Sequence, residues 1–206
     1  MAADRRTRLS PDERRAQLVA LGVAALADRP LEELSLDELC AQAGVSRGLL
    51  FYYFESKQGF HREVVRTARD SMLHATEPQP DLPPLQRLTV TLTSIVRFVR
   101  EHPDTFFSLV RGAASGDVRV REVVEEARRI QTERVAAVFA ELGAPESVLL
   151  AVALRSWVAF AEQALVDGAL ETDMGSDDIV RFLQRSLIAV TTTVDPAIGR
   201  LVDDRL

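Results

Sequence analysis

Apolar residues recur at three- and four-residue intervals along most of the chain, which is the spacing of one face of an α-helix. The series Phe60, Val64, Ala68 and Met72 is one example, and the stripe from Leu85 to Val99 is another. The sequence shows no convincing alternation of apolar and polar residues, internal repeat or low-complexity tract. The pattern therefore predicts an all-α protein.

Helix-start and helix-stop signals divide the chain into segments. Ser10, Pro11 and Glu13 have the spacing of a capping box, and Ser35 opens a second helix in the same way. Four prolines make residues 77–84 the best candidate for a linker or a domain boundary. The predicted helices cover approximately residues 10–27, 35–43, 46–54, 56–72, 85–99, 104–114, 118–142, 146–167 and 176–194.

A helix-turn-helix is predicted between residues 35 and 54. Gly44 ends its first helix, because glycine readily adopts a left-handed backbone, and Ser46 caps the next helix after a very short turn. This second helix carries the unbroken aromatic block FYYF, residues 51–54. Because four consecutive residues of a helix point in four directions, some of these rings are expected at the surface.

The two sides of this second helix have different predicted roles. Leu50 and Phe54 are four residues apart and should face a small core, so the opposite side is free to enter the major groove of DNA. There Arg47 can bind guanine, Gly48 allows close approach, and Phe51 can contact a thymine methyl group. The predicted DNA-binding set, which adds groups suited to phosphate, is Ser35, Ser46, Arg47, Gly48, Leu49, Phe51, Tyr52, Tyr53 and Lys57. The alternative is that the aromatic residues only complete a helical core.

The chain resembles the TetR family of bacterial transcriptional regulators over residues 10–65. The resemblance rests on the Ala-Gly-Val-Ser turn, the following basic residue and glycine, and the aromatic run with Ser-Lys beyond it. It implies an all-helical homodimer with a helix-turn-helix DNA-binding domain over residues 1–55. Residues 56–206 would then form a linking helix and a helical effector-binding and dimerisation domain. Leu49 and Phe51 replace the family's common threonine and tyrosine, so base preference is expected to be unusual.

Charge argues against a protein that coats nucleic acid by bulk electrostatics, because the formal net charge is −6. Residues 1–75 are nevertheless balanced, with eleven basic and eleven acidic side chains. Near the N-terminus, a basic cluster suits local contact with phosphates or is simply a solvated terminus; it comprises Arg5, Arg6, Arg8, Arg14 and Arg15.

Three features favour a cytoplasmic location. The single cysteine, Cys40, is expected as a core residue and fits a reducing compartment. The N-terminal segment lacks the apolar stretch of a secretion signal. Residues 148–166 are apolar but include Arg155 and Glu162, so we interpret them as a buried helix of a soluble protein rather than a membrane span.

The helix at residues 146–167 is apolar on nearly every side, so it must be covered all round. One side is expected to face the subunit interior and the other a partner subunit. With the helix at residues 176–194 of each chain, it would form a four-helix interface under a two-fold axis that includes Leu183 and Leu187. Burial within one larger monomeric bundle is the alternative.

A small-molecule pocket is expected where the C-terminal helices converge. Its predicted lining is Phe98, Phe106, Phe107, Arg111, Trp157 and Phe160. Arg155 and Glu162 could orient a polar group there, or could instead serve the interface or an ion pair. Core packing explains each aromatic residue equally well.

No enzyme motif or metal-ligand spacing accompanies these features. His61, His74 and His102 are expected at surface or boundary positions, and no cofactor or metal is predicted. The sequence predicts a cytoplasmic, homodimeric regulator of transcription that binds double-stranded operator DNA. A repressor released by an unknown small-molecule effector is favoured over an activator. A helical enzyme and a helical interaction protein without operator binding are the alternatives.

Overall fold

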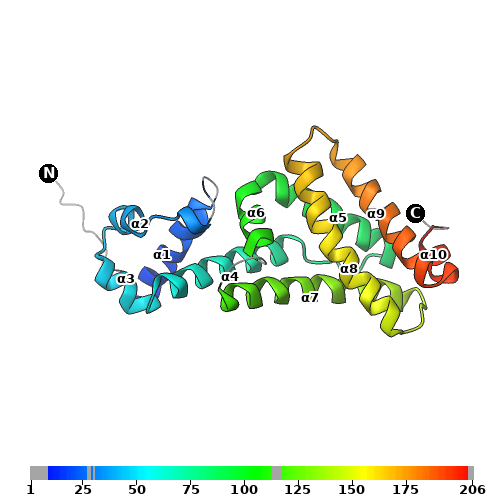
Figure 1. Ribbon diagram of the computed structural model, residues 1–206, viewed down its shortest axis with the longest axis horizontal. Helices are drawn as coiled ribbons and strands as arrows, with labels where there is room; N and C mark the ends of the chain where they lie inside the picture. The colour runs from blue at the N-terminus through cyan, green and yellow to red at the C-terminus, as the bar shows by residue number, and fades with distance from the viewer. Residues whose placement is uncertain (1–8, 27–28, 30, 113–116, 204–206) are drawn as a thin grey trace.

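The computed structural model describes residues 9–26, 29, 31–112 and 117–203, and it is helical throughout these ranges, with no strand. The molecule is elongated: α1 to α3 lie at one end, α5 to α10 at the other, and α4 runs between them (Figure 1). The elements of the N-terminal end are α1 (Pro11–Ala25), η1 (Leu31–Glu33), α2 (Leu36–Ala43), α3 (Arg47–Phe54) and α4 (Lys57–Ala75). The remaining elements are α5 (Pro84–Glu101), α6 (Pro103–Gly112), α7 (Val118–Glu141), α8 (Val148–Leu165), η2 (Val166–Leu170), α9 (Ser176–Val194) and α10 (Pro196–Asp203).

Local signals fix the first three helices. The capping box at the start of α1 is complete: the Glu13 amide donates to the Ser10 hydroxyl, and the Ser10 amide donates to the Glu13 carboxylate at 2.7 Å. Gly44 ends α2 with a left-handed φ of 67°, and Ser46 then caps α3 by accepting from the Leu49 amide. Cys40 is buried, and its burial raises the pKa of the thiol. The predicted helix-turn-helix and the core position of this cysteine are confirmed.

Helix α4 belongs to two packed regions, because it lies against α1 and also against α7. Phe60, Val64 and Val65 are fully buried, and farther along the helix Ala68 and Met72 continue the same apolar face. The predicted division of the chain between residues 55 and 56 stays a prediction, because α4 adheres to the regions on both sides of it.

The C-terminal body is a bundle in which α8 and α9 pack together and α7 lies against both α4 and α8. The proline-rich stretch does separate two helices, as predicted, since α5 begins at Pro84. Two elements go beyond the prediction: the π-helical turn η2, and the short helix α10, which packs on α9. The predicted first helix extends to residue 27, and that last residue lies outside the described ranges.

One expectation about the subunit interface is wrong. Leu183 and Leu187 have no exposed surface, because α9 turns them into the subunit's own core against α5 and α8. The outward face of α9 instead carries Phe182, which is 47% exposed. The spacing of apolar residues along α9 correctly identifies its buried side, but that side packs within the subunit and not against a partner.

Helix α8 and η2 together, Val148–Leu170, are the one stretch in the described residues long and apolar enough to cross a membrane. Leu154, Val158 and Leu165 are buried against the rest of the subunit. A core helix of a soluble protein passes the same test of length and composition, so this stretch is only weak evidence for a membrane span.

We predict that Gly59→Ala destabilises the N-terminal end of the protein. A Cβ atom at this position would lie 2.0 Å from the backbone oxygen of Phe54, so the turn between α3 and α4 would have to shift. Overpacking of this kind costs about 1–3 kcal/mol, which urea denaturation would measure. Gly48→Ala is the matched control, because only the Ser46 hydroxyl lies within 4 Å and helix propensity favours alanine by about 1 kcal/mol. Equal unfolding free energies for the two variants would contradict this account.

Candidate functional site

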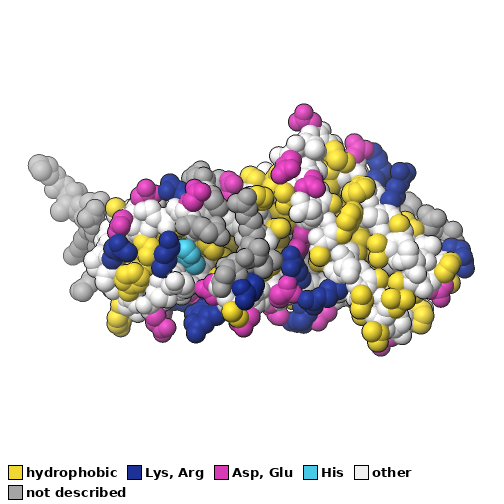
Figure 2. Space-filling model, viewed as in Figure 1, with side chains coloured by type: hydrophobic (Ala, Val, Ile, Leu, Met, Phe, Trp, Pro, Cys, Tyr) yellow, Lys and Arg dark blue, Asp and Glu magenta, His cyan; other side chains and the backbone are white. Residues whose placement is uncertain are grey.

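The exposed side of α3 is the candidate nucleic-acid interface. Leu50 and Phe54 anchor the helix in the core, whereas Arg47, Gly48 and Tyr52 are exposed, Tyr52 by 78%. A helix held by one face and polar or aromatic on the other has the form of a recognition helix. Hydrophobic and basic side chains are both visible at this end of the molecule in Figure 2.

The four aromatic residues 51–54 point in different directions, as consecutive positions of a helix require. Phe51 and Tyr53 are half-buried and pack at the edge of the core, while Tyr52 stands away from it. The rings of Tyr52 and Tyr53 meet edge to face, with centroids 5.5 Å apart. The aromatic residues therefore complete the core in part and also present rings at the surface, with Tyr52 the most exposed of the four.

The Arg47 side chain has two contacts within the protein, with Asp37 and with Phe51. Its guanidinium lies 3.3 Å from a carboxylate oxygen of Asp37 and 5.8 Å from the centre of the Phe51 ring. Both partners of the ion pair are exposed, so the pairing is weak and exchangeable. The aromatic ring limits the directions that the Arg47 side chain can take.

The remaining predicted DNA-binding residues cluster at helix starts. Ser35 and Ser46 cap α2 and α3, and their hydroxyls accept from backbone amides at 3.3 and 3.2 Å. Leu49 is half-buried on the first turn of α3. Lys57 is exposed at the first position of α4. Amide groups at the helix starts and the exposed cation of Lys57 are of the kind that suits phosphate contacts.

The basic cluster near the N-terminus is not a uniform surface patch. Arg15 pairs with the buried Glu63 of α4 at 2.7 Å, and Arg14 donates to Gln17 and to the carbonyl of Ala43. These two arginines join α1 to its neighbours. The other members, Arg5, Arg6 and Arg8, lie outside the described residues.

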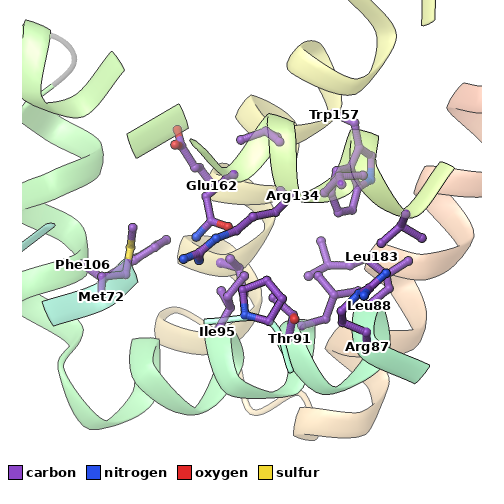
Figure 3. Close-up of a pocket in the computed structure, with 18 residues that line it drawn as sticks. Met72, Arg87, Leu88, Thr91, Ile95, Phe106, Arg134, Trp157, Glu162 and Leu183 are labelled. Atoms are coloured by element: carbon purple, nitrogen blue, oxygen red, sulfur yellow. The ribbon is translucent and has the colours of Figure 1, made fainter. Parts of the chain in front are cut away.

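The second candidate site is a cavity inside the C-terminal body (Figure 3). Its wall is formed mainly by α5, α7 and α8, with Met72 of α4, Phe106 of α6 and Leu183 of α9. The empty volume is about 760 Å³ including space open to solvent, but the centres of water-sized spheres can occupy only about 80 Å³ of it. The space that water-sized spheres can enter is therefore small.

The structure brings two of the six predicted pocket residues to this cavity, Phe106 and Trp157. Phe98 is buried beside the ring of His102, and Phe107 does not line the wall. Phe160 faces outward, with its ring 5.7 Å from that of Phe182. The side chain of Arg111 lies outside what the structure describes.

Polar wall residues on α7 were missed from the sequence. Gln131 and Arg134 line the cavity, and Arg128 reaches its rim by pairing with Glu162. Their spacing could have identified them from sequence, because Gln131 and Arg134 fall within the apolar series of the inward side of α7, which is Val124, Ala127, Val135 and Val138. From the sequence, no side was assigned to this helix, so these residues were not named.

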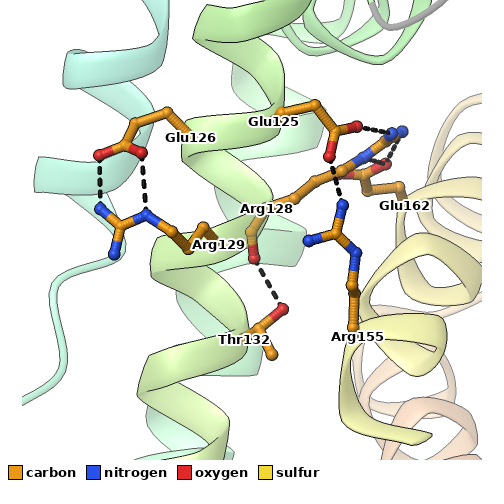
Figure 4. Close-up of polar contacts among 7 residues, drawn as sticks. All are labelled: Glu125, Glu126, Arg128, Arg129, Thr132, Arg155 and Glu162. Carbon is orange, nitrogen blue, oxygen red and sulfur yellow. Dashed lines mark hydrogen bonds and ion pairs between the residues drawn. The ribbon is translucent and has the colours of Figure 1, made fainter. Parts of the chain in front are cut away.

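An ion-pair network joins α7 to α8 at the cavity rim (Figure 4). Arg128 binds Glu162 through two nitrogens, at 2.9 and 2.6 Å, and also binds Glu125 at 2.9 Å. Arg155 contacts Glu125 at 2.6 Å. These hydrogen bonds, above all those that Arg128 donates to Glu162, raise the pKa of the Arg128 guanidinium. Arg155 and Glu162 therefore both form ion pairs, with Glu125 and Arg128 rather than with each other, and Glu162 also lines the cavity.

These two sites define a class of protein: a helix-turn-helix end joined by one shared helix to a helical body that holds an internal cavity. Residues 18–64 match the model of bacterial regulatory proteins, tetR family, and residues 84–194 match that of a tetracyclin repressor-like C-terminal domain. The second match alone spans more than half of the chain. The protein therefore belongs to the TetR family.

Individual relatives agree with this assignment. A TetR-family transcriptional regulator from Streptomyces coelicolor superposes with a TM-score of 0.78 at 25% identity, covering 95% of this chain and 89% of that one. The HTH-type transcriptional repressor KstR2 of Mycolicibacterium smegmatis is 23% identical over 187 residues, which are 89% of this chain and 80% of that protein. An uncharacterized HTH-type transcriptional regulator of Mycobacterium tuberculosis is 28% identical over 127 residues, 58% of this chain and 59% of the relative. The match thus spans less than two thirds of that relative's length.

We predict that Glu162→Gln lowers the free energy of unfolding by about 1–3 kcal/mol, because it removes a charged partner of Arg128 in a site where both side chains are about four-fifths covered. Glu126→Gln is the matched control on the same helix as Arg128. Its partner Arg129 is half exposed, so little change in stability is expected. Thermal denaturation at low and high salt would separate the two, and equal decreases in stability would argue against a special role for the rim pair.

Proposed function

We propose that this protein is a homodimeric transcriptional repressor that binds operator DNA through α3 and leaves it when a small molecule fills the cavity of the body. The observation that carries the proposal is the division of α3 into a buried side, with Leu50 and Phe54, and an exposed side, with Arg47, Gly48 and Tyr52. TetR-family regulators bind operator DNA and act as dimers with small-molecule effectors. DNA in the cytoplasm is the expected partner.

On this proposal Arg47 reads a base and the helix starts hold the backbone of the DNA. Arg47 exchanges its exposed carboxylate partner, Asp37, for guanine O6 and N7. Gly48 leaves room for the helix to approach, since nothing but the Ser46 hydroxyl lies near it. Lys57 and the hydroxyls of Tyr52 and Tyr53 then bind phosphate oxygens.

The dimer interface is proposed on the outward side of α8 and α9. Exposed apolar side chains follow this side: Val148 by 85%, Val152 by 55%, Phe160 by 43% and Phe182 by 47%. Figure 2 shows hydrophobic side chains over this end of the molecule. Apolar surface of this extent is costly in water, and a two-fold axis would bury the same side of both subunits.

Release of DNA follows from linkage between the cavity and α4. Met72 of α4 lies in the cavity wall, while Phe60 and Val64 of the same helix lie in the core of the DNA-binding end. If the form with displaced α4 fits the operator less well, an effector that prefers this form weakens DNA binding, and DNA weakens effector binding by the same factor.

We predict different effects on DNA binding for two substitutions. Arg47→Ala should cost about 1–3 kcal/mol per half-site and relax preference at one base pair, because the variant has no side chain to bind the guanine. Lys57→Ala should weaken binding to all sequences alike, and lower the salt slope by about 0.9 for each phosphate that is no longer neutralised. The measurement is binding to an operator and its single-base variants at several salt concentrations.

Arg29→Ala is the control for these variants, because Arg29 is a basic residue of the same end that pairs with Glu38 away from α3. It should leave base preference unchanged. If Arg47→Ala and Lys57→Ala both bind every sequence as the wild type does, α3 is not the DNA-reading helix. An inability of the wild type to bind any DNA would favour a helical enzyme or an interaction protein.

We predict that Phe182→Asp converts the dimer to a monomer, because it places a charge in an apolar contact on both subunits. The subunit fold should survive, since Phe182 is half exposed and its neighbour Leu183 keeps the core contact. Val118→Asp is the control, with 55% exposure on the first turn of α7. Sedimentation would measure the assembly state and circular dichroism the helix content. A Phe182→Asp protein that remains dimeric would exclude this side of α9 from the interface.

A further inference from the structure

Arg134 connects the cavity to the end of α4. Its guanidinium donates to the carbonyl of Leu73 at 3.0 Å and to the carbonyl and hydroxyl of Thr76 at 3.1 and 3.3 Å. All three of these acceptors are neutral oxygens. Burial lowers the pKa of the Arg134 guanidinium, and the more distant charge of Glu77 opposes this only in part. The positive charge of Arg134 is thus incompletely balanced.

The oxygens held by Arg134 are those that the end of a helix leaves without a partner. Helix α4 ends at Ala75 with Thr76 as its cap, and the last carbonyls of a helix have no amide of their own turn to bind. A cation at this position also matches the negative end of the helix dipole. Thr76 is completely buried, so its carbonyl depends on the protein for hydrogen bonds. Arg134 therefore fixes the end of α4 onto α7.

The other charged residues of the cavity wall have charged partners. Arg87 binds Glu141 at 2.5 Å, and Glu162 accepts three hydrogen bonds from Arg128. Among the wall residues that the structure describes, Arg134 is the cation whose hydrogen bonds go to uncharged groups. A single negative charge would complete the balance, whereas a phosphate monoester would bring about one and a half to two.

Most of the remaining wall is apolar. Leucine, isoleucine, valine and aromatic side chains provide most of it, including Leu88, Leu92, Ile95, Val138 and Trp157. Space for the centres of water-sized spheres amounts to about 80 Å³, which is room for several water molecules. An unbranched hydrocarbon chain is the thinnest apolar group, so it would require less movement of these side chains than a branched or cyclic group.

We propose that the effector is a linear aliphatic carboxylate whose head group binds Arg134 and displaces the carbonyls of Leu73 and Thr76. The effect of this ligand on DNA binding rests on the proposed function as a ligand-released repressor, whereas the binding of the ligand to Arg134 does not. Guanidinium and carboxylate form a two-pronged, charge-assisted pair that is stronger than a guanidinium–carbonyl contact. Binding would free the end of α4 from α7, and α4 carries that change to the DNA-binding end.

The test of binding uses the fluorescence of Trp157, which is the single tryptophan of the chain and lies in the cavity wall. The full-length dimer is titrated with decanoate, decan-1-ol and decyl phosphate below their micellar concentrations. Decanoate should bind at least about tenfold more tightly than the alcohol, as expected for one charge-assisted hydrogen bond. Equal affinity for decanoate and decan-1-ol, or tighter binding of decyl phosphate, would overturn the proposal.

Three variants identify the residue responsible. Arg134→Gln should abolish the preference for decanoate over decan-1-ol, while Arg134→Lys, which keeps the charge, should retain part of it. Arg97→Gln removes an exposed arginine of α5 that does not line the cavity, and it should bind as the wild type does. If Arg134→Gln lowers the melting temperature but keeps the preference for decanoate, Arg134 is only a structural cap of α4. If Arg134→Gln does not fold, Arg134→Lys decides. The proposal is contradicted if Arg134→Lys binds decanoate no more tightly than decan-1-ol. It is also contradicted if Arg134→Lys binds all three ligands as the wild type does.

Operator binding is measured separately to distinguish the two proposals. Decanoate should weaken operator binding by the wild type and by Arg97→Gln, and Arg134→Lys should respond at higher concentrations. A wild type that binds decanoate selectively but binds no DNA refutes the proposed function and leaves the ligand assignment intact. A wild type that binds its operator but shows no selective effect of decanoate refutes the ligand assignment alone.

Discussion

The structure depends on the burial of one helix in two places. Phe60 and Val64 of α4 have no exposed surface in the DNA-binding end, and Met72 of the same helix lies in the wall of the body's cavity. The buried Glu63 adds an ion pair to Arg15 of α1. A helix of 19 residues is about 28 Å long, and because it is stiff, displacement of one end changes the position of the other. The arrangement of both candidate sites follows from this shared helix.

Helix α8 shows how a second element serves two surfaces. Trp157 faces the cavity and donates to the Ser186 hydroxyl at 2.9 Å, while Phe160, three residues later, faces outward against Phe182. Three residues turn a helix by about 300°, so these two rings lie on neighbouring sides rather than on the same one. One side of α8 forms part of the cavity wall and a neighbouring side belongs to the proposed interface, so the two surfaces share this helix.

The DNA-binding end could be predicted from sequence because local chemistry determines it. Capping serines, a glycine with left-handed backbone and a four-residue apolar spacing each have a nearby cause, and α2 and α3 begin where these signals lie. Helix α10 was missed although Asp195 and Pro196 form an ordinary start signal, with the Asp195 carboxylate accepting from the Ala197 amide. The π-helical turn η2 has no comparable local signal.

The cavity could not be predicted in the same way, because its residues meet only through packing between distant helices. For α8, apolar on nearly every side, periodicity cannot say which side meets a partner, and for this reason Phe160 was expected in the pocket. In α9 the strongest apolar stripe proved intramolecular, which removed Leu183 and Leu187 from the interface. The polar wall residues Gln131 and Arg134 lie among apolar residues on the inward side of a helix that also carries many charges, and charge alone does not show which of its polar residues face inward.

The two inward arginines of α7 differ in a way that bears on regulation. Arg128 is paired with carboxylates of its own and the neighbouring helix, and breaking such a pair leaves a charge uncompensated, so this contact acts as a fixed connection between α7 and α8. Arg134 holds only carbonyl and hydroxyl oxygens, which are weaker partners for a cation. An entering anion would therefore compete more easily for the contacts of Arg134 than for those of Arg128, which would persist. The body would keep its shape at α7 and α8 as the end of α4 is released, so the displacement is directed along α4 toward the DNA-binding end.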